Sequence, residues 1–170
     1  AGGRALAGGD ILAAGDDVRR AARGHHPRGC LPGSGGLDRD GDPEVGQLDR
    51  AIERELVGTV CETGSDAVRD ADLVIFCVPV GAIGAVASEL AAAIPASAVI
   101  SDVGSSKQSV AEALSAALPG HVVIPAHPVA GTERSGPDAG FASLFHNRWC
   151  IVTPPSGADA AKVAALSAFW

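Results

Sequence analysis

Between residues 65 and 155, short apolar runs alternate with segments of helical spacing, and this alternation restricts the fold more than any other feature. The apolar runs predict strands at 73–79, 98–104, 121–128 and 149–155. The segments between and after them predict helices at 81–94, at 105–118, in a short stretch after Pro137 as far as Phe145, and from 158 to 170. Strands separated by helices form βαβ units around a parallel sheet. The sequence therefore predicts a doubly wound α/β fold with a mostly parallel sheet.

The composition agrees with such a sheet and excludes several partners. Apolar residues make up 46% of the 170 residues, aromatic residues only 4%, and tyrosine is absent. A core built from Ala, Val, Ile and Leu is typical of helix-covered parallel sheets. The net charge of −7 argues against nucleic acid and anionic membrane surfaces, which attract basic patches, but not against a small anionic substrate. We find no signal peptide and no apolar stretch of the ~18 residues that a transmembrane helix needs, so we expect a cytoplasmic protein.

The four cysteines do not indicate a metal or redox site. No two of them form a C-x-x-C pair, and we expect no metal. Cys77 and Cys150 lie inside apolar runs and are expected to be small buried hydrophobic residues. Reduced thiols also suit the cytoplasm.

Unusual residues lie at the carboxyl ends of three of the predicted strands. They are 78–80, which are Val78, Pro79 and Val80, then 102–107, then 127–136. The carboxyl ends of parallel strands meet at one edge of the sheet, and ligands bind outside that edge. We therefore expect these three segments to gather around one site.

The segment DVGSSK, residues 102–107, joins a strand to a helix. Gly104 would let the backbone turn sharply. Ser105 would lie at the helix N-terminus, where it can cap the helix, contact an anionic ligand, or do both; Gln108, three residues later, fits a capping box. Lys107 is expected to be a solvated cation in the first turn, although the helix dipole disfavours a cation there.

His127 is the candidate base of this edge. Imidazole is the natural proton acceptor near neutral pH, although a histidine after a strand can also be purely structural. Glu133 and Arg134 could orient it, bind substrate, or pair at the surface. A serine hydrolase fits poorly, because the nucleophile motif G-x-S-x-G is absent.

Residues 1–64 are less regular. They are rich in Gly, Arg and Asp and show no apolar strand run. The segment GSGGLD, residues 33–38, approaches a dinucleotide-binding motif, but its third glycine is missing and HHPRGCLP before it is not expected to be a strand. Asp38 could hold a ribose hydroxyl, as an acidic residue does in such folds, or could lie in a solvated turn.

The blocks DADLVIFCVPVGAI, SDVGSSKQSV, PAHPVAGTERSGPDAGFASLF and WCIVTPP together resemble the prephenate and arogenate dehydrogenase family of tyrosine biosynthesis. They occur in the family's order and at similar spacing. The resemblance covers about residues 36–170 and is strongest over 66–155. It implies a Rossmann-like nucleotide-binding domain and an oxidative decarboxylation of prephenate or arogenate with NAD or NADP.

The resemblance also implies roles for single residues. His127 would accept the proton of the substrate hydroxyl, and Ser105 would hold that histidine, the substrate and the cofactor together. Thr132 and Glu133 would lie on the substrate side. The residues expected at the cofactor are Val78, Pro79, Asp102, Gly104 and Asp38.

The resemblance divides the chain into three parts. Residues 1–64 would be a poorly defined part of the nucleotide-binding domain. The family's glycine fingerprint is not recognisable in residues 1–35, which have either diverged or are read in another frame. Residues 65–157 would be the core of the domain, and 158–170 would begin a helix before a helical dimerisation domain. We therefore expect a homodimer at full length and weak or no activity from this chain alone. The alternatives are another nicotinamide dehydrogenase, such as a β-hydroxyacid type, or an inactive nucleotide-binding fragment.

Overall fold

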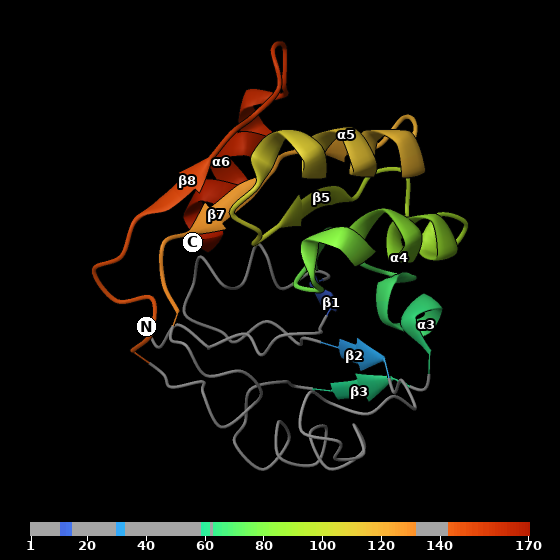
Figure 1. Ribbon diagram of the computed structural model, residues 1–170. Helices are drawn as coiled ribbons and strands as arrows, with labels where there is room; N and C mark the ends of the chain where they lie inside the picture. Colours follow the sequence, from blue (N-terminus) through green and yellow to red (C-terminus); the bar gives the residue numbers. More distant parts are fainter. Residues whose placement is uncertain (1–10, 15–29, 33–58, 62, 132–142) are drawn as a thin grey trace.

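The computed structural model describes residues 11–14, 30–32, 59–61, 63–131 and 143–170, and the fold is given for these residues (Figure 1). In chain order the elements are β1 (Ile11–Ala14), β2 (Cys30–Pro32), β3 (Thr59–Cys61), α3 (Gly64–Val68), β4 (Leu73–Phe76), the 3-10 turn η1 (Val80–Ala82), α4 (Ile83–Leu90), β5 (Val99–Asp102), α5 (Lys107–Ala117), β6 (Val122–Val123), β7 (Ala126–Pro128), β8 (Cys150–Val152) and α6 (Ala160–Phe169). The alternation of strands and helices predicted after residue 65 is confirmed.

The main sheet has four strands in the order β1-β4-β5-β6. Its β4, β5 and β6 are parallel, with Leu73 opposite Val99 and Val99 opposite Val122. Two smaller sheets pair β2 with β3 in parallel and β7 with β8 antiparallel. The predicted α/β fold with a mostly parallel sheet is therefore correct for the core of the domain.

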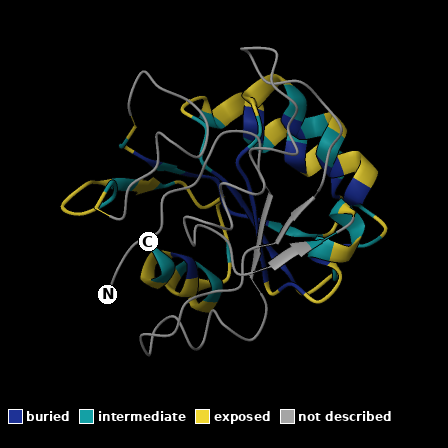
Figure 2. Ribbon diagram, turned by 90° about the horizontal axis from the view of Figure 1, so that it is seen from below, coloured by how far each residue is buried: buried dark blue, intermediate teal, exposed yellow. Residues whose placement is uncertain are grey.

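Both faces of the main sheet are covered. All residues of β4 and β5 are buried, because helices pack on each side of the sheet. On one face Val74, Phe76 and Ile100 pack with α3, α4 and α5, and on the other Leu73 and Ile75 pack with α6. Figure 2 shows the buried strands in the middle and the exposed outer sides of the helices around them. The ends of the strands are therefore the places where polar side chains can reach solvent.

The helices form where the apolar spacing places one face on the sheet. In α4 the buried residues are Ile83, Ala87 and Leu90, which lie on one side of the helix. In α5 they are Val110 and Leu114. Each helix thus buries an apolar stripe against the sheet.

The predicted strand 121–128 is two strands in the structure. β6 ends before Pro125, which has no N–H to continue a ladder, and β7 then pairs with β8. β8 is antiparallel to β7, so the expectation that the last strand shares the parallel order is wrong. This change of partner places His127 in a separate two-stranded sheet, whose β7 still contacts β5 of the main sheet.

The expectation that HHPRGCLP is not a strand is also wrong, and residues 1–64 contain short strands that no apolar run revealed. β1 lies antiparallel beside β4, and β2, within the HHPRGCLP segment, pairs with β3. These strands have four and three residues, too short for a periodic pattern to reveal them. The glycine-rich segment 33–38 lies outside the described residues.

The cysteines differ in their environments. Cys77 is buried, as predicted, and its Sγ donates to the Ile75 carbonyl oxygen over 3.8 Å. Cys150 is partly buried and carries a free thiol, whereas Cys61 is disulfide-bonded, against the expectation of reduced thiols. Within the described ranges no cluster of His, Cys, Asp or Glu could hold a metal ion, and no helix there is long and apolar enough to span a bilayer.

Candidate active site at the strand ends

The carboxyl ends of β4 and β5 lie at the same edge of the sheet, as the sequence predicts for parallel strands. After β4, Val78 is half-buried and Pro79 is exposed. After β5, Gly104 is half-buried and Ser105 is exposed. The structure thus places four of the predicted site residues at one edge.

Gly104 is required for close packing and not for an unusual backbone angle. It is not among the described glycines with positive φ. A Cβ on Gly104 would lie 2.9 Å from Cγ2 of Val80 and 3.1 Å from Oδ2 of Asp102. The predicted sharp turn is therefore the wrong reason for this glycine, which instead lets the chain after β4 approach the end of β5.

The predicted capping box of α5 is not formed. The N-cap is Ser106, one residue later than expected, and no side chain caps the helix there. The amide of Gln108 instead donates to Glu112 Oε1 over 3.1 Å. The exposed Ser105 therefore lies just outside the helix.

His127 lies in β7 with a half-buried side chain. Its Nδ1 lies 3.1 Å from the carbonyl oxygen of Val103. A carbonyl can only accept, so this hydrogen bond requires the proton on Nδ1. In the neutral imidazole Nε2 then carries the lone pair, which is the form that a general base needs.

Asp102 and Lys107 form a buried ion pair next to His127. The Lys107 Nζ and Asp102 Oδ2 atoms are 2.5 Å apart, and the exposed fractions of the two side chains are 19% and 0%. The expectation of a solvated Lys107 is therefore wrong. Asp102, expected at the cofactor, has no exposed side-chain surface. It can therefore affect this edge only through the groups that it binds, such as the Gly104 N–H and Lys107.

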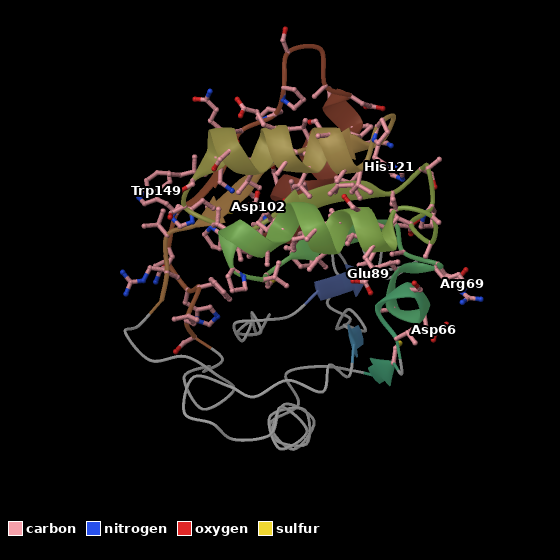
Figure 3. All side chains as sticks on the ribbon, turned by 45° about the vertical axis from the view of Figure 1, so that its right-hand side comes forward. Asp66, Arg69, Glu89, Asp102, His121 and Trp149 are labelled. Carbon is pink, nitrogen blue, oxygen red and sulfur yellow. The ribbon has the colours of Figure 1, made fainter. Side chains whose placement is uncertain are left out.

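An exposed apolar surface lies on the β7–β8 ribbon beside His127. Val129 is 46% exposed, Trp149 83% and Ile151 50%. Ile151 is opposite His127 in the antiparallel register, and the two therefore share a face. Figure 3 shows Trp149 at the left-hand edge of the molecule and Asp102 further inside. A flat apolar ring next to the imidazole could pack on this face.

Cys150 lies on the opposite face of the same ribbon. Burial raises the pKa of its thiol, although a backbone hydrogen bond from His127 and the charge of Lys107 act in the other direction. The thiol is therefore more strongly protonated than an exposed one, and its position indicates packing and not nucleophilic chemistry.

A pocket of about 640 Å³ lies between α5, β6 and the segment 153–159. Lys107 and His121 line it, but His127 and Ser105 are not among its described lining residues. The candidate site is therefore the exposed strand edge, which this pocket adjoins through Lys107.

Some predicted residues fall on parts of the chain that the structure does not describe. They are Asp38, Thr132, Glu133 and Arg134. The helix expected after Pro137 lies largely there as well. Sequence reasoning missed the burial of Lys107 and its pairing with Asp102. The available signal was a cation at a helix N-terminus, five residues after an aspartate.

Comparison with known proteins agrees with this arrangement. Residues 38–170 match the family described as prephenate dehydrogenase, nucleotide-binding domain. A cyclohexadienyl dehydrogenase of Zymomonas mobilis is 46% identical over 122 residues, which are 72% of this chain and 42% of that protein. A prephenate dehydrogenase of Bacillus subtilis is 31% identical over 118 residues, or 68% of this chain and 32% of that protein.

Among solved structures, a Synechocystis arogenate dehydrogenase superposes with a TM-score of 0.70 at 28% identity, covering 95% of this chain and 54% of that one. The chain thus spans less than half the length of the two curated relatives and about half of this structure. The family match extends over well beyond half of the chain and includes β4, β5, α5, β7 and β8. This chain belongs to the family of prephenate dehydrogenase nucleotide-binding domains.

Proposed function

We propose that this chain carries the nucleotide-binding part and the general base of an enzyme that oxidatively decarboxylates prephenate, or its amino analogue arogenate, with NAD or NADP. The products would be 4-hydroxyphenylpyruvate or tyrosine. The observation that carries the proposal is the contact of His127 Nδ1 with the Val103 carbonyl, which leaves Nε2 as an acceptor at the strand edge. Membership in the family and the names of the relatives support the reaction class.

The described residues at the strand edge fit a nicotinamide nucleotide. Pro79 and Val80 expose apolar surface after β4, and Gly104 offers no side chain that would obstruct a ligand there. Val78, Pro79 and Gly104 would contact the cofactor. Asp102 would hold this edge in place, because its carboxylate accepts the Gly104 N–H. When bound, the nicotinamide ring accepts the hydride from the carbon that carries the substrate hydroxyl.

His127 would take the proton of that hydroxyl through Nε2. Removing this proton makes the hydride leave more readily. The ring carboxylate departs as carbon dioxide, and the electron pair it leaves completes the aromatic ring. Ser105, two residues after Val103, would hold the hydroxyl near the imidazole. Thr132 and Glu133 would bind the substrate, and Asp38 would bind the ribose of the cofactor.

We also propose where the protein occurs, how it assembles and what it binds. The acidic chain would belong to a cytoplasmic homodimer that binds a small anionic substrate and neither nucleic acid nor membranes. The domain boundaries expected from the sequence, after residues 64 and 157, are part of the same proposal.

The first experiment follows NAD(P)H absorbance with prephenate and then arogenate, for a protein with the full length of its relatives and for the 170-residue chain. We expect turnover from the full-length protein and little or none from the shorter chain. Absence of turnover from folded full-length protein with every combination would favour a different dehydrogenase or an inactive nucleotide-binding protein. Robust turnover by the shorter chain would contradict the division of the site.

His127→Asn in the full-length protein tests the base. The asparagine amide can still donate to the Val103 carbonyl but offers no imidazole, so turnover should fall by roughly 10²–10⁴ with cofactor affinity nearly unchanged. His121→Gln is the matched control, because His121 lies at the amino end of β6 and its Nε2 lies 3.4 Å from the Ile94 carbonyl oxygen. A His127→Asn enzyme at the wild-type rate would make His127 a structural residue.

A further inference from the structure

Lys107 occupies a position that is unfavourable for a cation. It is the first residue of α5, where the helix dipole opposes positive charge. Its side chain is only 19% exposed, so its ammonium group has also lost most of its water. A lysine in this position needs specific partners, and the partners indicate what it does.

The partners are two groups on different strands. Nζ donates to Asp102 Oδ2 at the end of β5, over 2.5 Å, and to the Ala126 carbonyl oxygen in β7, over 2.6 Å. The carboxylate of Asp102 also accepts from the Gly104 N–H over 2.8 Å and, through Oδ1, from the Ala126 N–H over 3.3 Å. The ion pair therefore holds Ala126 by both its N–H and its carbonyl.

Ala126 immediately precedes His127. Its carbonyl belongs to the peptide group that joins the two residues, so fixing that carbonyl fixes the plane from which the histidine projects. The imidazole in turn donates to the carbonyl of Val103, the residue after Asp102. Both ends of the His127–Val103 hydrogen bond are thus tied to one ion pair.

We propose that the Lys107–Asp102 pair is the positioning device that keeps His127 on the Val103 carbonyl, with the proton on Nδ1 and the lone pair on Nε2. Lys107 and Asp102 are positioning residues, since they act through the backbone of Ala126. The proposal deepens the function proposed above, because it matters for catalysis only if His127 is the base. A pair that merely stabilised the fold would leave the imidazole tautomer unchanged.

The test measures the tautomer directly. Long-range proton–nitrogen spectra of the full-length protein, with isotope-labelled histidine, report which ring nitrogen of His127 carries the proton; the His127→Asn variant assigns the signal. The wild type should show the proton on Nδ1. Lys107→Met should show a mixture of the two tautomers. Its turnover should fall by about 10–100-fold, by analogy with the loss of a residue that orients a metal-binding histidine. The Michaelis constant for the cofactor should stay nearly unchanged.

The control is Lys162→Met, because Lys162 also donates to a backbone carbonyl, that of Ser97 over 3.0 Å, but on α6. It should keep the wild-type tautomer and turnover. If Lys107→Met does not fold, Lys107→Met with Asp102→Asn removes both buried charges and gives the same test. In Lys107→Ala, ethylammonium in the solution should restore part of the lost turnover, because the pocket of about 640 Å³ reaches this position.

The outcomes separate the two proposals. A folded Lys107 variant that retains the Nδ1 proton overturns the positioning role, whatever the activity. The other outcome combines two results: the tautomer changes in the Lys107 variant, and the wild-type protein shows no turnover on prephenate or arogenate. That outcome supports the positioning role and overturns the proposed function instead.

Discussion

Two ion pairs of this protein have the same chemistry and opposite surroundings. Asp66 and Arg69 lie on and just after α3, 2.8 Å apart, with exposed fractions of 45% and 66%. Asp102 lies at the end of β5 and is completely buried, and Lys107 lies at the start of α5 with 19% of its side chain exposed. Figure 3 shows the first pair at the outer rim and Asp102 in the interior. Water screens the first pair, while the second organises the backbone around the candidate base.

The comparison also shows why burial changes what a charge can do. A surface pair contributes little, because each partner is well solvated without the other. In the interior each partner depends on the other, and removing one leaves an uncompensated charge. Asp102 additionally accepts two backbone N–H groups, so its loss would leave those donors without their partner.

The largest effect is expected for Asp102→Ala. It leaves the Lys107 ammonium without its counter-ion and two backbone N–H groups without their acceptor, and the free energy of unfolding should fall by about 3–5 kcal/mol. Urea unfolding followed by circular dichroism measures this. Asp72→Ala is the control, since Asp72 is exposed, and it should change little. An Asp102→Ala protein as stable as the control would remove the distinction between the two pairs.

A smaller effect is expected for Gly104→Ala, which keeps the buried pair but crowds it. The added Cβ would lie 3.1 Å from Asp102 Oδ2 and closer still to Val80, so we expect a loss of about 1–3 kcal/mol in the same assay. Gly81→Ala is the matched control, because a Cβ there meets nothing within 4 Å. Equal stabilities of the two variants would show that the strand edge accommodates a methyl group at position 104 without loss of stability.

The smallest effect is expected for Arg69→Ala. The exposed pair with Asp66 should contribute no more than about 1 kcal/mol, and less at high salt. Unfolding at low and high ionic strength measures both values. A loss comparable to that of Asp102→Ala, and insensitive to salt, would mean that exposure does not separate the two pairs.

Much of the fold could be predicted from local pattern. The apolar runs of β4 and β5 and the helical spacing of α4 and α5 were recognisable because each is decided by neighbours along the chain. The short β1 and β2 could not be recognised, because strands of this length exist only through their partners. The division of 121–128 was missed for a related reason: Pro125 ends one ladder, but only β8 provides the next.

The candidate site divides in the same way. The sequence placed Ser105 and Gly104 just after a strand, where the structure has them, whereas His127, expected at a strand end, lies within the separate strand β7. The sequence could not show that Lys107 is mostly buried, because one of the two residues that hold its ammonium group, Ala126, lies 19 positions away. The assignments of Asp38, Thr132 and Glu133 stay predictions.

By itself the sequence determined the order of strands and helices after residue 65, the edge at which polar residues gather, and the family. Tertiary structure alone decided which of these polar groups are buried together. The contacts that orient His127 join residues 24 positions apart, from Val103 to His127 and from Asp102 to Ala126. No local pattern encodes such hydrogen bonds, because they form only when β5 and β7 are packed side by side and water has been excluded from between them.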